Sequence, residues 1–96
     1  MSPINKIKLK ILRNKIDNVD NSLIKLIKQR TTLVKKVKKI KETKKHIVDK
    51  IRIKKILKDI RNKSIKNNID PKITKRIWSN MIYAYIDFEK KIFRKK

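Results

Sequence analysis

The fold of this chain is decided by residues 9–40, which read LKILRNKIDNVDNSLIKLIKQRTTLVKKVKKI. Apolar side chains recur in this stretch at alternating steps of three and four residues, and one arginine interrupts them. The positions of this seam are Leu9, Leu12, Ile16, Val19, Leu23, Leu26, Arg30, Leu33, Val37 and Ile40. Such spacing over about four heptads predicts a helix that packs along its whole length in a coiled-coil-like manner.

The length of this helix predicts a dimer. From about Pro3 to Lys41 it would span roughly 58 Å at 1.5 Å per residue. The residues that remain can form only two shorter helices, which cannot cover such a length within one chain. We therefore expect the seam to pack against a second copy.

Two shorter helices complete the expected fold, at about 49–66 and 71–93, so that residues 1–96 form one all-α domain. The second helix is expected to face inward with Ile53, Ile56, Leu57 and Ile60. The third carries two neighbouring stripes, one of Ile73, Ile77, Met81, Ala84, Phe88 and Ile92 and one of Trp78, Ile82, Tyr85 and Glu89. No segment shows the sustained alternation that indicates a strand.

Helix ends are marked by local signals. Ser2-Pro3 and Asp70-Pro71 each place a capping side chain directly before a proline, which favours a helix start. Asn67-Asn68 predicts a left-handed stop for the helix before it. The stretch 42–48 breaks the apolar period and predicts the other turn.

Composition limits the class of protein. A chain of 96 residues buries a small core, and such chains usually depend on disulfides, a metal or a partner chain. There is no cysteine and His46 is the single histidine, so disulfides are excluded and no metal or cofactor is expected. Lysines interrupt every apolar run, so we expect no signal peptide, no membrane span and a cytoplasmic location.

The formal net charge of +23 favours polyanionic partners such as nucleic acids. The lysines are spread along the whole chain, however, and Gly is absent while Ile and Asn are abundant. An AT-rich coding sequence would give any solvated surface this composition, so we expect at most non-specific nucleic-acid binding. A basic helical dimer that binds nucleic acid remains the alternative from another class of function.

Arg30 occupies a seam position among aliphatic neighbours. A cation there needs an anionic group beside it, which is either Asp17 or Asp20 across a dimer or an anionic ligand. Arginine is rare among the 31 basic residues. The positions that have arginine rather than lysine are therefore candidates for binding a carboxylate through two parallel hydrogen bonds from a planar guanidinium. The six arginines are Arg13, Arg30, Arg52, Arg61, Arg76 and Arg94.

Glu89, like Arg30, is a charged residue on an otherwise apolar stripe. It lies one turn beyond Tyr85 in the expected third helix. It is either a salt-bridging residue near the lysine-rich end or a pocket residue that burial keeps protonated. The chain offers no glycine-rich phosphate loop, no nucleophile beside a histidine and no paired carboxylates. A site made of cations and little else suits the binding of an anion without covalent catalysis.

Several of these residues together resemble the all-helical (type II) chorismate mutases. The first-helix pattern is Leu12-Arg13-x-x-Ile16-Asp17-x-x-Asp20, Leu26-Ile27-x-x-Arg30 and Val34-x-x-Val37-x-x-x-Lys41. The later parts are Asp49-x-x-Arg52, Ile69-Asp70-Pro71, Ile77-Trp78 and Glu89. The resemblance covers about residues 9–90.

This resemblance implies an intertwined homodimer that converts chorismate to prephenate without a cofactor, for phenylalanine and tyrosine biosynthesis. Arg30 would hold one substrate carboxylate, and Arg13 of the other chain would reach in to the second. Lys41 would contact the ether oxygen, to which Glu89 would donate a hydrogen bond. Because the rearrangement is pericyclic, catalysis would consist of holding the reactive conformer and stabilising charge on that oxygen.

The remaining contacts implied by the resemblance come from Asp49, by the ring hydroxyl, and Arg52, near the anionic end. Two positions depart from the family pattern. Ile53 replaces the Glu that commonly follows the second-helix Arg, and Tyr85, counted here as substrate-binding, replaces a Ser. An Ile directly after the second-helix Arg, as at Ile53, resembles the isochorismate pyruvate lyases of the same fold. Lyase activity, or a regulatory or scaffold role, is therefore the alternative within the family.

Overall fold

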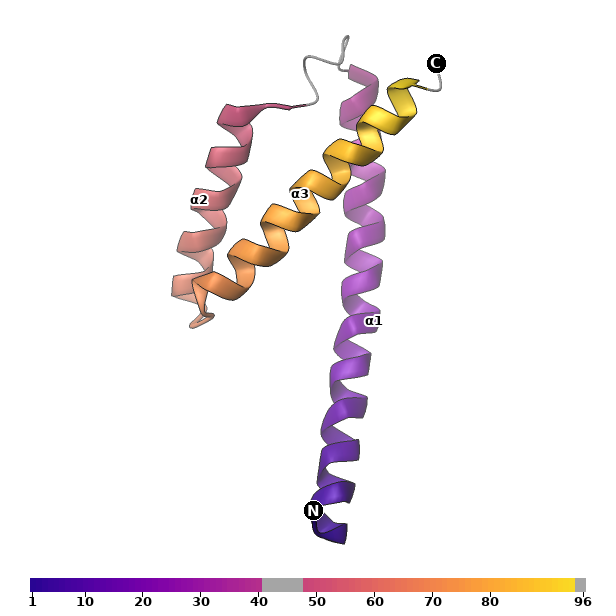
Figure 1. The fold of residues 1–96 in the computed structure, drawn as a ribbon, viewed down its shortest axis with the longest axis vertical. Coiled ribbons are helices and arrows are strands. Elements are labelled where there is room, and N and C mark those ends of the chain that lie inside the picture. Colours follow the sequence, from indigo (N-terminus) through magenta and orange to yellow (C-terminus); the bar gives the residue numbers. More distant parts are fainter. Residues whose placement is uncertain (41–47, 95–96) are drawn as a thin grey trace. The chain divides into compact units, whose positions relative to one another are not determined.

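The computed structural model describes residues 1–40 and 48–94, which form three helices and no strand (Figure 1). The helices are α1 (Pro3–Ile40), α2 (Lys50–Lys66) and α3 (Pro71–Arg94). The expected all-α class is therefore confirmed. By its contacts the chain divides into two compact units, Met1–Lys36 and Val37–Lys96.

The observed helix bounds lie within one residue of those expected from the sequence. α1 ends at Ile40 rather than at about residue 41, α2 begins at Lys50, and α3 ends at Arg94. The expected turn at 42–48 falls mostly outside the described residues. None of the three helices combines the length and the apolar character that a membrane span requires.

Capping side chains begin the helices as the sequence predicts. In α1 the backbone N–H of Asn5 donates to Oγ of Ser2, the residue directly before Pro3, at 3.2 Å. In α3 the backbone N–H of Lys72 donates to Oδ1 of Asp70 at 2.9 Å. Each bond satisfies one of the N–H groups that a helix start leaves without an intrahelical partner, and is worth about 1 kcal/mol.

The end of α2 is stopped by a left-handed residue, as expected from the two asparagines there. Asn68 has a φ of 56°, which asparagine adopts more readily than most residues. The N–H of Ile69 then donates to the carbonyl of Ser64 at 2.9 Å, and that of Asn68 to the carbonyl of Ile65 at 3.2 Å. This Schellman arrangement reverses the chain and sends α3 back along α2.

The unit Met1–Lys36 consists of the greater part of α1. Its seam is open to solvent in the single chain, and four of its side chains are between 56 and 59% exposed: Leu12, Val19, Leu26 and Leu33. An apolar stripe of this length is unusual on the surface of a monomer. The packing of this seam against a second copy stays a prediction.

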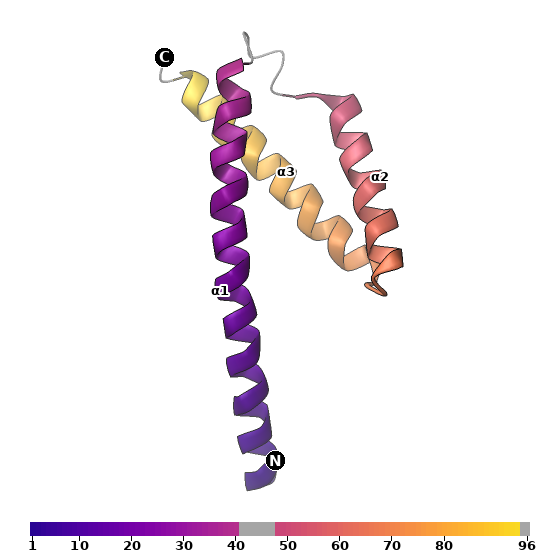
Figure 2. The ribbon, with the colours of Figure 1, turned by 180° about the vertical axis from the view of Figure 1, so that it is seen from behind.

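The second unit contains a small core between α2 and α3. Ile82 and Ile86 of α3 are buried, and Ile53, Ile56 and Leu57 of α2 pack against them. Figures 1 and 2 show the two helices joined by the turn at one end and diverging from it, so that the chain direction reverses between α2 and α3. The inward face predicted for α2 is thus confirmed at Ile53, Ile56 and Leu57.

The stripes of α3 differ in exposure. The stripe that contains Ile82 faces the core, whereas Ile73 and Ile77 of the other stripe are 56 and 52% exposed. Ile86, which the sequence analysis assigned to neither stripe, belongs to the buried face.

A buried hydrogen bond joins α2 to α3 near their turn. The hydroxyl groups of Ser64 and Thr74 lie 2.6 Å apart, and either can donate. Oγ of Ser64 also lies 2.6 Å from the carbonyl of Ile60, and Oγ1 of Thr74 lies 3.3 Å from that of Pro71. Each hydroxyl has one hydrogen, so the one that donates to its carbonyl accepts from the other. These two small polar residues therefore hold the helices close where the core is narrow.

Replacing Thr74 by valine should test this bond, because the side chain keeps its shape and loses its hydroxyl. We expect the free energy of unfolding to fall by about 1 kcal/mol, measured by denaturant titration at one fixed protein concentration. Thr32→Val is the matched control, since Thr32 is exposed and its hydroxyl donates to the carbonyl of Lys28 at 3.1 Å. Equal losses in the two variants would show that the buried bond contributes nothing.

Candidate functional site

The two arginines expected from the first helix both lie on α1 in the unit Met1–Lys36. Arg13 is exposed and Arg30 is half-buried. Seventeen residues separate them, which is about 26 Å along a helix that rises 1.5 Å per residue. A single copy of α1 cannot bring both guanidinium groups to one small ligand.

Asp49 and Arg52 stand at the beginning of α2. Asp49 is the N-cap of this helix, and its Oδ1 accepts a hydrogen bond from the backbone N–H of Arg52 at 2.9 Å. Both side chains are exposed. The capping bond fixes the carboxylate of Asp49 next to the first turn, where the N-terminal end of the helix dipole favours negative charge.

Tyr85 and Glu89 lie one turn apart on the face of α3 that meets the core. Tyr85 is half-buried, and Glu89 is only 6% exposed. Ile53, the neighbour of Arg52, packs against the core pair Ile82 and Ile86. Arg52 itself is exposed, whereas Glu89 is buried one turn beyond Ile86 of this cluster.

Lys41, expected to contact the reacting oxygen, lies outside the described residues. Of the other six expected residues, Arg13 and Arg30 belong to the first unit. The second unit contains Asp49, Arg52, Tyr85 and Glu89.

Lys38 is buried, although the sequence predicts it to be one more solvated lysine. It is 9% exposed, in the last turn of α1 and within the second unit. The available signal was its spacing, because it follows the half-buried Val34 by four residues and so continues the same helical face. Lys38 and Glu89 are the two buried ionisable side chains in the described part of the chain.

Burial and charge give this group of residues its chemistry. The residues expected at the site from the sequence are four cations, two carboxylates and a phenol: Arg13, Arg30, Lys41, Arg52, Asp49, Glu89 and Tyr85. Within 1–40 and 48–94 no three His, Cys, Asp or Glu side chains gather as they would around a metal ion. Such a set can bind carboxylates through bidentate guanidinium contacts and can donate hydrogen bonds to an oxygen that gains charge.

Neither a curated protein nor a solved structure matches the chain. A family model described as chorismate mutase type II does match it, over residues 12–90. This span begins immediately before Arg13 and ends immediately after Glu89, so it contains every residue expected at the site. The chain therefore belongs to the type II chorismate mutase family.

Proposed function

We propose that this protein is a cytoplasmic chorismate mutase, which rearranges chorismate to prephenate in phenylalanine and tyrosine biosynthesis. The observation that carries the proposal is the family match over 12–90, because it spans all of the expected contacts from Arg13 to Glu89. The reaction breaks the ether carbon–oxygen bond and forms a carbon–carbon bond in one step. No nucleophile, metal or proton transfer is needed.

The proposed site is completed by a second copy of the chain. Arg30 and Arg13 of one chain are too far apart to hold the two carboxylates of one substrate molecule. An Arg13 that reaches across a homodimer removes this difficulty, and the open seam of α1 offers the surface for such a dimer. Each dimer then has two sites, and each site draws on both chains.

The proposed role of each site residue follows from the charge of its side chain. Two arginines clamp the dicarboxylate in its compact conformer, which supplies orientation. Lys41 and Glu89 meet the ether oxygen, where negative charge grows in the transition state. Asp49, Arg52 and Tyr85 surround the rest of the substrate. The large positive charge of the chain also speeds the capture of a dianion, so turnover at low substrate should fall as salt rises.

The direct test is to follow the loss of chorismate by absorbance and to identify the product. Prephenate supports the proposal. Salicylate and pyruvate, formed from isochorismate, would instead identify a lyase. The observation that favours a lyase is Ile53, which packs against the core and so offers no polar contact to a ring hydroxyl. No turnover of either substrate would favour a regulatory or scaffold role.

The charge of the chain is the one observation that favours nucleic-acid binding. Exposed lysines occur on all three helices rather than on one. Dispersed lysines neutralise phosphates without reading bases, so any binding should be lost as salt rises to physiological concentration.

Glu89 is tested by substitutions that keep or remove its hydrogen-bond donor. If its side chain donates a hydrogen bond to the ether oxygen, Glu89→Gln should keep kcat, because an amide also donates. Glu89→Leu has no donor and should lower kcat by about 100-fold or more. The measurement is kcat at saturating chorismate.

Asp87→Leu is the matched control for Glu89→Leu, because Asp87 is exposed on the same helix and the change in charge is the same. It should keep the wild-type kcat. Thermal unfolding of both variants shows whether a loss of kcat is only a loss of folded protein, since Glu89 is buried. Wild-type kcat in Glu89→Leu would remove Glu89 from the mechanism.

A further inference from the structure

A second candidate site lies between α2 and α3, away from the proposed active site. It is a cavity of about 280 Å³. Its lining residues are Leu57, Lys58, Ile60, Arg61, Pro71 and Lys75. Three of them are apolar and three are cationic, so the cavity combines a hydrocarbon surface with positive charge from both helices.

Among the residues that the structure describes, the lining includes no carboxylate, and the two acidic residues nearest to it in sequence are engaged elsewhere. A helix turns by about 100° per residue, so Asp59, two positions from both Leu57 and Arg61, faces away from them. Lys55 lies 3.0 Å from Asp59, and this hydrogen bond holds the pKa of Asp59 below its ordinary value. Asp70, beside Pro71, caps α3. The positive charge at the cavity therefore has no anion among its lining residues.

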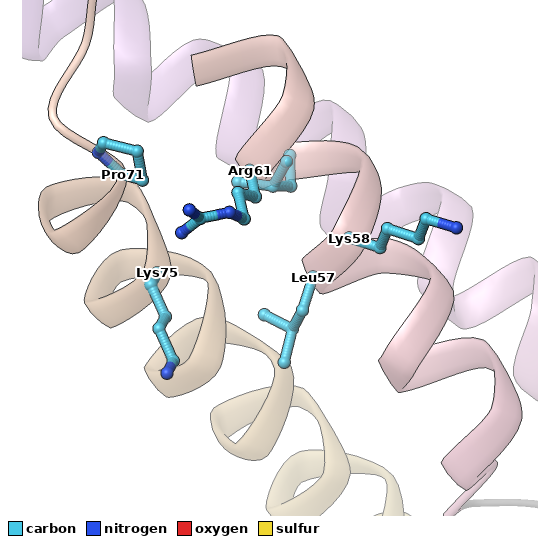
Figure 3. A pocket seen from close by; sticks show the side chains of 6 residues that line it. Leu57, Lys58, Arg61, Pro71 and Lys75 are labelled. Carbon is cyan, nitrogen blue, oxygen red and sulfur yellow. The ribbon is translucent and has the colours of Figure 1, made fainter. Parts of the chain in front are cut away.

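Arg61 is the cation best placed to use the cavity. Figure 3 shows its side chain extending from α2 toward Pro71 at the beginning of α3, with Leu57 also directed between the helices. Lys58 points away from α3 in the same view, whereas Lys75 lies on α3 itself. Arg61 is also one of only six arginines, and the proposed mutase site does not use it.

We propose that this cavity binds a small organic carboxylate with a single ring or short hydrocarbon body. The carboxylate would take the planar fork of Arg61 with Lys75 beside it, and the apolar body would lie on Leu57, Ile60 and Pro71. Pockets for drug-sized ligands have about 300–1,000 Å³, so a cavity of 280 Å³ suits a smaller molecule.

This site is distinct from the proposed mutase site. Arg61 lies nine residues beyond Arg52, about 14 Å along α2, and Lys75 lies fourteen residues before Glu89, about 21 Å along α3. A ligand that contacts Arg61 and Lys75 bridges the two helices near their turn. Its binding would stabilise the α2–α3 hairpin by mass action. The inference does not depend on which reaction the protein catalyses.

The test uses the purified full-length protein, with benzoate as the probe, at low and at physiological salt. Backbone amide resonances of residues 57–61 and 71–75 should shift saturably with benzoate. Two matched probes separate the contribution of the benzoate ring from that of its charge. Benzyl alcohol keeps the ring without the charge, and inorganic phosphate keeps the charge without the ring. Each should bind at least about fivefold more weakly at these residues, because each loses one half of the proposed contact.

Two arginine variants decide whether the cavity or the overall charge is responsible. Arg61→Gln should weaken benzoate at these residues by about tenfold or more, as expected for the loss of a charged hydrogen bond. Arg76→Gln removes the same charge from an exposed position of α3 outside the lining, and should leave the affinity within about twofold. Equal losses in the two variants, phosphate as tight as benzoate, or shifts that never saturate would each overturn the proposal.

Discussion

Arg30→Lys is expected to lower kcat/KM for chorismate by about 30- to 1,000-fold, although the charge is kept. This range corresponds to a loss of about 2–4 kcal/mol in transition-state stabilisation. Arg30 is half-buried on the seam of α1, where a planar guanidinium can meet a carboxylate with two parallel hydrogen bonds. A lysine there offers a point charge on a flexible stem, so the substrate is held less tightly in its reactive conformer.

Steady-state kinetics at constant salt measures this effect, and Arg76→Lys is its control. Arg76 is exposed on α3 and outside the proposed site, so the same substitution should leave kcat/KM unchanged. Near-normal kinetics of Arg30→Lys would show that Arg30 serves the packing of the seam rather than the substrate.

A mixing experiment extends this test across the interface. Arg13→Ala and Arg30→Ala chains should each be nearly inactive alone, because every site of either homodimer lacks one clamp. A heterodimer of the two has one site with both arginines and one site with neither, so co-expression should restore activity. Failure to complement would show that the two residues do not act across the interface.

The helices could be predicted from the sequence because their signals are local. The alternating steps of the seam, the Ser2 and Asp70 caps and the stop at Asn68 each depend on residues within about one turn. The same holds for the inward face of α2, where the spacing of Ile53, Ile56 and Leu57 already places them on one side. Such features need no knowledge of what lies opposite.

Other features could not be predicted because they arise between elements. Apart from its spacing from Val34, the local sequence does not distinguish Lys38 from its solvated neighbours, yet it is buried in the last turn of α1. The bond between Ser64 and Thr74 joins residues ten apart through a turn, and both residue types are ordinary on a helix surface. The depth of burial of Glu89, likewise, is set by how closely the core packs around it.

The candidate site was predictable in its residue types and less so in its geometry. The cation-rich composition and the isolated Arg30 indicate an anion site without any resemblance to a family. The roles of Arg13, Lys41 and Asp49 came only with that resemblance. The cavity beside Arg61 needed the structure, because its lining comes from two helices that meet only after the turn at Asn68.

The second large effect is expected from the seam itself, at Leu26. This side chain is 57% exposed in the single chain, and we expect it to be buried against a second copy. Burial of a leucine is worth about 1.5–3 kcal/mol, and a symmetric dimer buries two. Leu26→Asp should therefore raise the dimer dissociation constant by more than about 100-fold, before the cost of burying two carboxylates is added. Sedimentation equilibrium across a range of protein concentrations measures this constant.

Ile24→Asp is the control for Leu26→Asp, because Ile24 is exposed on the same helix but lies off the seam, and the change in charge is identical. It should remain dimeric at micromolar concentration. Because folding is expected to depend on association, the unfolding temperature of the wild type should rise with protein concentration, and that of Leu26→Asp should lie well below it. Turnover should fall in parallel with the dimer fraction, since each proposed site needs Arg13 from the partner chain. A folded, active monomer of the wild type at micromolar concentration would contradict both the dimer and the shared site. An unchanged dissociation constant in Leu26→Asp would place the interface on another face of α1.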